Sequence, residues 1–179
     1  MARPGFVQIS SQVQGMLSGP ETIMKLDSLS YVLAFEHNVH MPLSGSLSAN
    51  TDMGFNASSQ SPAVFGGQPV HQPISFVKPI DDTTPQLYQA LCERELLDKV
   101  TFFWTQFSKK GEVELVFEIE LLNARLIGVQ PAMPDLSQPE HDALPYREQV
   151  ALIYEAISWR YGPTAEVEYK TQSDAGKKV

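Results

Sequence analysis

The chain of 179 residues is poor in cysteine, and it has no long hydrophobic run. Cys92 stands alone, so no intramolecular disulfide can form and the fold does not depend on an oxidising compartment. No segment approaches the ~20 apolar residues that a membrane-spanning helix needs. Residues 1–6 also lack the apolar stretch of a signal peptide. We therefore expect a protein that is cytoplasmic at first and that, if secreted, leaves without a cleaved signal peptide.

Basic charge is scarce as well. The chain has 13 lysines and arginines against 21 aspartates and glutamates, a formal net charge of −8. A small basic cluster, Lys177-Lys178, lies at the C-terminus. An acidic protein of this kind repels phosphate backbones, which argues against nucleic acid as a partner. Hydrophobic residues make up 42% of the chain, enough for a packed core in one domain.

Helical patterns are nearly missing, whereas strand patterns are plentiful. Between residues 100 and 161 the apolar residues recur with a period of two, which is typical of strands. Over residues 100–107, Phe103 and Phe107 point to one face, and Val100, Phe102 and Trp104 point to the other. A lone antiparallel sheet normally leaves one face polar. We therefore expect other copies of the chain to cover the second apolar face.

The whole pattern predicts a mainly β protein, a compact antiparallel β-barrel of about eight strands with one flanking α-helix. A capping threonine, Thr83 or Thr84, opens the helix over residues 85–94. Residues 109–111 form a hairpin turn, and Asn123 marks a bulge. We predict one domain over residues 1–170 and a flexible tail over residues 171–179. The strands are expected over residues 6–10, 27–39, 70–77, 100–107, 112–121, 124–129, 147–161 and 167–169.

Residues 41–69 differ from the rest in composition, since they are rich in Ser, Gly, Asn and Pro and have no clear periodicity. A segment this long without secondary structure is uncommon in a compact domain and is usually functional or disordered. Scattered apolar residues favour an extended loop that docks onto something. The docking residues that we predict are Leu43, Leu47, Met53, Phe55 and Phe65.

Four groups of residues could support chemistry, and none makes a convincing enzyme. His37 and His40 are three apart, which chelates a metal on a helix but places the side chains on opposite faces of a strand. Trp104 and Trp159 could stack on a sugar or a base, yet in alternating strands they are more often core or interface residues. Cys92 lies late in the helix, where the dipole does not activate it. We expect no catalytic residue, no cofactor and no metal.

The remaining group is a row of four glutamates, Glu112, Glu114, Glu118 and Glu120. Paired carboxylates could serve a hydrolase as acid and base. The simpler interpretation is the solvated face of an amphipathic strand, whose other face carries Val113, Leu115, Phe117, Ile119 and Leu121.

Several segments resemble the hemolysin-coregulated protein (Hcp) family, the tube proteins of bacterial type VI secretion systems. The resemblance is good over residues 70–159 and loose over residues 1–41. It is carried by a strand after the long loop, a helix entry with the next strand, and a long strand near the C-terminus. In order, these are Val70-His71-Gln72-Pro73-Ile74-Ser75-Phe76, Asp82-Thr83-Thr84-Pro85-Gln86-Leu87-Tyr88-Gln89-Ala90-Leu91, Leu97-Asp98-Lys99-Val100-Thr101-Phe102-Phe103-Trp104, and the strand ending Ile157-Ser158-Trp159.

The resemblance implies homohexameric rings that stack into a hollow tube. Its partners would be copies of itself, the type VI sheath, a VgrG-like spike and effectors in the lumen. The long loop would reach the neighbouring ring, although this loop departs from the common family pattern. We predict that a ring neighbour covers Phe103, Ile153, Ile157 and Trp159.

Two other functions stay open from the residues alone. A small monomeric β-barrel could bind an apolar ligand in its mouth, which would explain the inward apolar faces but not the outward ones. A carboxylate-based hydrolase depends only on the glutamate row. Both would be non-structural roles, unlike that of a tube subunit.

Overall fold

The computed structural model describes residues 4–44, 64–65, 68–135, 137, 145–162 and 167–172. The N-terminal strands are β1 (Gly5–Ser11), β2 (Gly15–Met16), β3 (Glu21–Ile23), β4 (Leu26–Val32), β5 (Ala34–Glu36), β6 (Val39–His40) and β7 (Leu43–Ser44). They are followed by β8 (Val64–Phe65), β9 (Val70–His71), β10 (Ile74–Pro79) and the helix α1 (Thr83–Cys92). The C-terminal strands are β11 (Leu97–Phe107), β12 (Val113–Ala132), β13 (Arg147–Ile153), β14 (Ala156–Tyr161) and β15 (Val167–Gln172).

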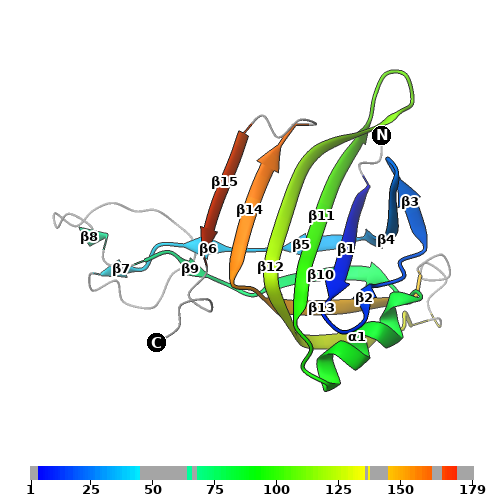
Figure 1. The fold of residues 1–179 in the computed structure, drawn as a ribbon, viewed down its shortest axis with the longest axis horizontal. Helices are drawn as coiled ribbons and strands as arrows, with labels where there is room; N and C mark the ends of the chain where they lie inside the picture. The colour runs from blue at the N-terminus through cyan, green and yellow to red at the C-terminus, as the bar shows by residue number, and fades with distance from the viewer. Residues whose placement is uncertain are drawn as a thin grey trace.

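Eleven of the described strands form two sheets that share the long strand β12, and β6, β7, β8 and β9 form two separate two-stranded ladders (Figure 1). The upright sheet has the order β15-β14-β12-β11-β1-β4-β3, with β2 paired to β1, and the base sheet has the order β12-β13-β10-β5. Strand β12 pairs with β14 as far as Leu122, with β11 as far as Ala124, and with β13 from Arg125 onward. At this change of partners Asn123 has a φ of 52°, so the irregularity expected at this residue is where the strand bends from one sheet into the other.

A second bend, at Leu33, carries β4 of the upright sheet into β5 of the base sheet. The N–H of Leu33 donates a hydrogen bond of 2.7 Å to the carbonyl of Val77 in β10. The two ends of the pairing path, β3 and β5, are not hydrogen-bonded to each other, so the barrel is not closed. The prediction of a mainly β, antiparallel fold with one helix is confirmed.

The core lies between the two sheets, where the inner faces of their strands meet. Helix α1 packs against β12 and buries Leu87 and Ala90. The fully buried side chains of the strands include Ile74, Phe76, Leu97, Val100, Phe102, Leu121, Val150 and Leu152. This set joins residues from both halves of the chain, so neither half could form the core alone.

The start of the helix differs from the prediction. Thr83 and Thr84 lie within the first turn, and the residue before them, Asp82, makes no side-chain capping bond. The capping oxygen comes instead from Asp81, whose Oδ1 accepts hydrogen bonds from the N–H of Thr83 at 2.9 Å and from its hydroxyl at 2.6 Å. Asp81 also binds Lys78, so the helix entry is fixed by an ion pair that local sequence does not reveal.

Two strands that the sequence predicts as continuous are broken by corners. Residues 27–39 form β4, β5 and β6, and residues 147–161 form β13 and β14 with a corner at Tyr154 and Glu155. The corner changes which side chains face inward: Val150, Leu152 and Tyr154 are buried before it, and Ile157 is buried after it. An uninterrupted strand would have placed Ile157 on the opposite face from Leu152.

The alternation expected over residues 112–121 is also interrupted. Trp104 pairs with Phe117 but Thr105 pairs with Leu115, so Val116 is an extra residue in β12. As a result Leu115 packs with Phe103 on the outer face of the sheet, whereas Phe117 packs against the main core. The prediction that both share one face is wrong, because a bulge shifts the pleat by one residue.

Candidate assembly surface

The inner face of the upright sheet carries an apolar row that the base sheet leaves partly open. Because directly paired residues point to the same side of a sheet, the register places Trp104, Phe117, Tyr161 and Val167 in line across β11, β12, β14 and β15. Trp104 and Phe117 lie in contact, with ring centroids 5.0 Å apart. Trp104 is 37%, Tyr161 54% and Val167 66% exposed.

The open part of this row is carried by β14 and β15, which extend the upright sheet past β12 (Figure 1). Within the described part of the chain, strand β15 pairs on one side only, with β14, so its other edge has backbone groups without a strand partner there. Its Tyr169 is 64% exposed and stacks on the half-buried Trp159 at 5.8 Å. An apolar face that ends in a free strand edge is suited to pairing with another chain.

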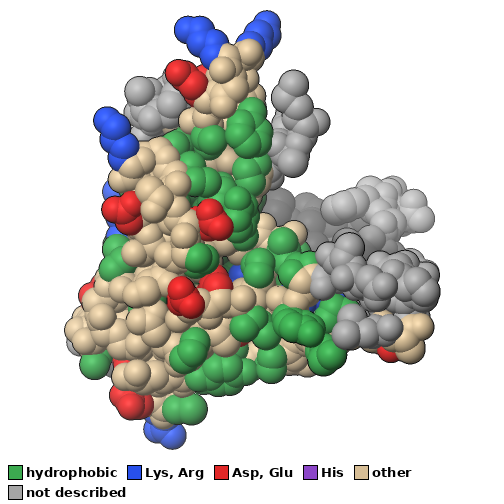
Figure 2. Space-filling view, turned by 90° about the vertical axis from the view of Figure 1, so that its right-hand side faces the viewer, with side chains coloured by type: hydrophobic (Ala, Val, Ile, Leu, Met, Phe, Trp, Pro, Cys, Tyr) green, Lys and Arg blue, Asp and Glu red, His purple; other side chains and the backbone are tan. Residues whose placement is uncertain are grey.

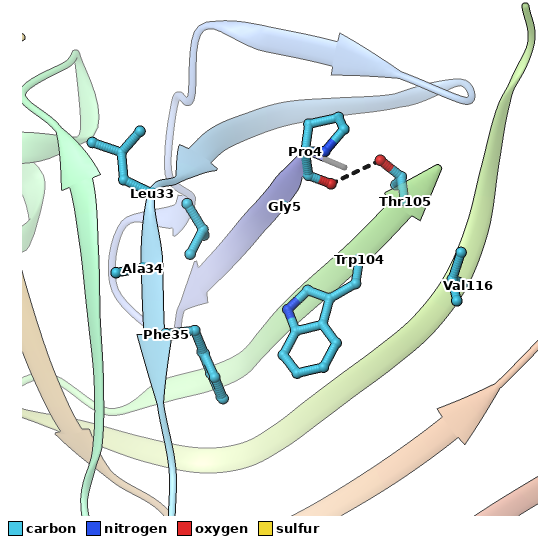
Figure 3. A pocket seen from close by; sticks show the side chains of 9 residues that line it. Pro4, Gly5, Leu33, Ala34, Phe35, Trp104, Thr105 and Val116 are labelled. Carbon is cyan, nitrogen blue, oxygen red and sulfur yellow. Dashed lines mark hydrogen bonds between the residues drawn. The ribbon is translucent and has the colours of Figure 1, made fainter. Parts of the chain in front are cut away.

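A pocket continues this surface at the corner where β4 turns into β5 (Figure 3). It has a volume of about 310 Å³ and is open to solvent on one side. Trp104 and Phe35 line it in edge-to-face contact, with ring centroids 5.6 Å apart. Of two further lining residues, the carbonyl of Pro4 accepts a hydrogen bond of 2.8 Å from the hydroxyl of Thr105. Figure 2 shows hydrophobic side chains gathered along the angle between the upright and the base sheets.

The four residues predicted for the ring interface do not share one uncovered face. Phe103 is only 7% exposed, because Phe6 and Leu29 of β1 and β4 pack around it. Ile157 is 1% exposed and belongs to the main core. The chain itself therefore covers these two side chains, contrary to the argument that a neighbour must do so.

The other two residues of that set are partly exposed. Trp159 lies on the inner face between the rings of His37 and Tyr169. Ile153, which pairs with Arg125, precedes the corner and lies on the outer face of the base sheet. The interface role of these residues stays a prediction. The exposed apolar row was missed because a local pattern does not show that β14 and β15 pair beside β12 in one sheet.

The glutamate row is solvated only in part: Glu112 and Glu114 are exposed, as the sequence suggests, whereas the other two glutamates are largely covered. Glu118 and Glu120 have side chains only 13% exposed, and both bind Arg160 of β14, with Glu120 also binding Lys99 of β11. Burial raises the pKa of Glu118, and the charge of Arg160 opposes it only in part. Burial would also raise the pKa of Glu120, but Lys99 and Arg160 together lower it. Ion pairs of Glu118 and Glu120 thus connect β12 with β11 and β14 on the outer face of the upright sheet.

The extended loop leaves the body through two short ladders (Figure 1). Strand β6 pairs with β9, and further out β7 pairs with β8, so that Leu43 lies opposite Phe65 in the backbone register. We call residues 39–71 the arm. The other predicted docking residues, Leu47, Met53 and Phe55, lie outside the described residues.

The root of the arm brings together a tyrosine and two histidines. Nε2 of His37 lies 2.7 Å and Nδ1 of His71 lies 2.9 Å from the hydroxyl of Tyr154. His40, which the three-residue spacing suggested as a second metal ligand beside His37, is exposed on β6. No group of three potential metal-ligating side chains occurs among the residues that the structure describes.

With this geometry in view, comparison with known proteins identifies the family. The family model described as "Type VI secretion system effector, Hcp" matches residues 6–161, most of the chain. The chain belongs to the Hcp family. This family consists of structural secretion proteins and not of enzymes. The resemblance that the motifs of residues 70–159 suggested is thereby confirmed.

Relatives of this Hcp chain match it over nearly its whole length. The "Major exported protein" of Pseudomonas aeruginosa is 26% identical over 183 residues, covering 97% of this chain and 95% of the relative. A double mutant of Hcp1 from the E. coli EAEC 042 pathovar has a TM-score of 0.74 at 23% identity, covering 96% of this chain and 99% of that one. Secreted protein Hcp3 of Pseudomonas aeruginosa has a TM-score of 0.68 at 20% identity, with coverages of 96% and 99%.

The two structures are similar to this chain in fold. In the described part of the chain, no helix has the length and apolar character needed to cross a membrane.

Proposed function

We propose that this Hcp protein is the subunit of a type VI secretion tube, in which homohexameric rings stack around a hollow lumen. The observation that carries the proposal is the apolar row that ends in the free edge of β15. The upright sheet ends in β15 on one side of the subunit and in β3 on the other. Because these two edges differ, a contact between the β15 side of one subunit and another side of its neighbour is head to tail. Contacts of this type close into a ring when the rotation between subunits permits it.

In the proposed ring, the neighbour covers Trp104, Tyr161, Val167 and Tyr169, which are exposed large apolar side chains on one face of the upright sheet. Trp159 and Ile153 flank this contact, and Phe103 and Ile157 support it from within the fold. A specific contact of ordinary size buries roughly 800 Å² on each partner. A row of aromatic side chains over several strands is a suitable centre for one.

The proposed partners are further copies of the chain in the stacked rings, the sheath around them, a VgrG-like spike at the end and effectors within the lumen. The protein would be assembled in the cytoplasm and secreted by the machine without a cleaved signal peptide. This agrees with the name of the Pseudomonas aeruginosa relative, a major exported protein.

The edge of β15 can be tested with Val167→Lys. A lysine at this 66% exposed position would place a charge in the proposed contact, so we expect rings in the wild type and monomers in the variant, by light scattering and by electron microscopy. The matched control is Val13→Lys, which adds the same charge at a 69% exposed position in the β1–β2 turn and should leave rings intact. A wild-type protein that is a clean monomer would contradict the proposal.

The rival function, binding of a small apolar ligand, has one observation in its favour, the pocket beside Trp104 and Phe35. Its volume is near the lower end of the range for ligand sites, roughly 300 Å³. A monomeric wild type whose melting temperature rises strongly with fatty or aromatic compounds would favour this function over the tube.

The arm can be tested separately by deleting residues 44–68. The deletion removes β8 and the outer part of the arm but leaves the base sheet and the upright sheet complete, so we expect rings to form at wild-type yield. Stacking of rings and secretion should be lost, as measured by electron microscopy of assembled tubes and by the amount of protein in the culture medium. A deletion variant that stacks and is secreted normally would exclude the arm from the stacking contact.

A further inference from the structure

Four segments of the fold line the pocket beside Trp104, and their backbones are held in place. They are the start of β1, the corner between β4 and β5, and the facing parts of β11 and β12 (Figure 3). The corner is held by the hydrogen bond from the N–H of Leu33 to the carbonyl of Val77. The start of β1 is held by Pro4, whose carbonyl accepts bonds from the N–H and the hydroxyl of Thr105, at 3.1 and 2.8 Å. The pocket therefore does not need an occupant to keep its shape.

The two aromatic walls of the pocket are anchored as well. Phe35 packs against Phe102 of the main core, with ring centroids 4.9 Å apart. Trp104 packs against Phe117, which itself contacts the main core, with ring centroids 5.0 Å apart. Neither ring can turn to close the pocket without losing one of these contacts. A site that is formed in advance costs less to fill than one that must be ordered on binding.

The lining selects an occupant that is mainly apolar. Its polar side-chain groups are the hydroxyl of Thr105, which already donates to Pro4, and the indole N–H of Trp104. That N–H has no hydrogen-bond partner in the part of the chain that the structure describes. The neighbouring ring carbon, Cδ1, lies 3.6 Å from the position that a Cβ of Gly5 would take, so this edge of the indole borders the pocket. A covered indole N–H usually has an acceptor, so an occupant that brings one acceptor fits best.

Water would fill the pocket poorly once another surface covers it. An ordered water needs two to four polar partners, and the side chains of the lining offer it little besides the indole N–H. A void would lose contacts along all its walls. The volume of about 310 Å³ is sufficient for a large side chain, since a cavity of roughly 150 Å³ can hold benzene. A covering surface is therefore more stable if it inserts a side chain than if it lies flat.

The surroundings of the pocket favour a second copy of the chain as the source of that side chain. Trp104 belongs both to the pocket and to the apolar row that a neighbour covers in the proposed ring. Leu33, which also lines the pocket, is 51% exposed, so apolar surface continues around it. A neighbour that covers Trp104 together with Tyr161 thus reaches the pocket as part of the same contact.

We propose that the Trp104 pocket is a socket in the contact between neighbouring subunits, and that it receives an apolar side chain of the second copy. The inference rests on the proposed ring and adds how the neighbour is held at this point. A large side chain that fills a desolvated pocket commonly supplies much of the binding energy of an interface. The socket therefore contributes strongly to the stability of the ring and little to that of the single subunit.

Gly5→Val tests the socket by filling it from within the subunit. Gly5 lines the pocket, and an added Cβ would lie 3.6 Å from Cδ1 of Trp104 and 3.6 Å from Cβ of Val32, at ordinary van der Waals distances. A β-branched side chain also suits a strand. We expect rings diluted to nanomolar concentration to dissociate about tenfold faster or more, as followed by mass photometry. In the monomeric Val167→Lys background, the melting temperature should stay the same or rise.

Two further variants make the test specific. The matched control is Gly128→Val, the same substitution in β12, where an added Cβ would meet nothing within 4 Å and which does not line the pocket. Its rings should dissociate at the wild-type rate. Gly5→Ala adds only the Cβ, so its rings should dissociate faster than wild-type rings by a smaller factor. This variant still decides the question if Gly5→Val folds poorly.

The outcomes separate the socket from the ring itself. Wild-type rings together with unchanged dissociation of both Gly5 variants would overturn the socket and leave the proposed function standing. Equally fast dissociation of the Gly5→Val and Gly128→Val rings would also overturn it, because the effect would not depend on the pocket. A wild type that forms no rings would overturn the proposed function, and the socket with it.

Discussion

Replacing Lys78 with methionine should lower the free energy of unfolding by about 3–5 kcal/mol. The side chain of Lys78 is 0% exposed and binds two carboxylates, Asp81 at 2.7 Å and Glu148 at 2.9 Å. It also donates to the carbonyl of Pro79 at 2.8 Å. Without the ammonium group, two acidic groups would share a site with no cation. Denaturant unfolding followed by tryptophan fluorescence measures the loss.

The reason for this large effect lies at Glu148, whose side chain is also 0% exposed. Its Oε1 accepts a hydrogen bond from Thr84, but its Oε2 has no hydrogen-bond partner among the described residues. Lys78 is thus the group that offsets the cost of burying this charge. Burial would raise the pKa of Asp81, yet the hydrogen bonds from Lys78, Thr83 and Ser30 and the charge of Lys78 lower it. The cluster therefore loses stability as the pH falls through the pKa of Asp81 in the folded state.

Two further variants make this prediction specific. Lys99→Met removes a lysine that is 50% exposed and binds Glu120, so it should cost less than about 1 kcal/mol. The double variant Lys78→Met, Glu148→Met should be more stable than Lys78→Met alone, because an apolar pair replaces the buried charge. Equal losses for Lys78→Met and Lys99→Met would contradict the assignment of a buried ion pair.

Phe102→Ala should destabilise the fold by about 3–5 kcal/mol, because it removes a ring from the centre of the core. Phe102 is 0% exposed, and its ring centroid lies 4.9 Å from that of Phe35 in β5 and 5.1 Å from that of Phe76 in β10. It is therefore one of the central contacts between the upright sheet and the base sheet. Equilibrium unfolding in denaturant gives the change directly.

The control is in the same strand. Phe107→Ala removes the same side chain at a position that is 44% exposed near the end of β11, so we expect a loss well below that of Phe102→Ala. If the two variants lose the same stability, the two sheets do not depend on Phe102 for their packing.

The local features of the fold could be predicted well from the sequence. The period-two pattern over residues 100–107 gave the correct two faces of β11, since Phe102 lies in the main core and Phe103 in the outer cluster. The turn at residues 109–111 was also correct, and Gly111 has the positive φ of 81° that such turns need. These features depend on residues close together in the chain, so the sequence carries the signal for them.

The assembly surface could be predicted only in outline. An apolar face that needs a neighbour was expected around Phe103 and Ile157, but the chain covers both, and the exposed row lies instead along Trp104, Tyr161 and Val167. The corner after Ile153 exchanges the two faces of the strand and turns Ile157 into the core, whereas Phe6 and Leu29 of neighbouring strands cover Phe103. Neither effect has a local signal in the sequence.

The sequence by itself determined the β-rich class, the single helix, the hairpin turn and the membership of the Hcp family. Only the tertiary structure decided which side chains are left exposed, that Lys78 is buried beside Glu148, and that His37 meets His71 and not His40. The physical reason is distance along the chain. Alternation within a strand is a local property, whereas a bend, a buried ion pair and a shared hydroxyl depend on strands far apart in sequence that meet only in the folded protein.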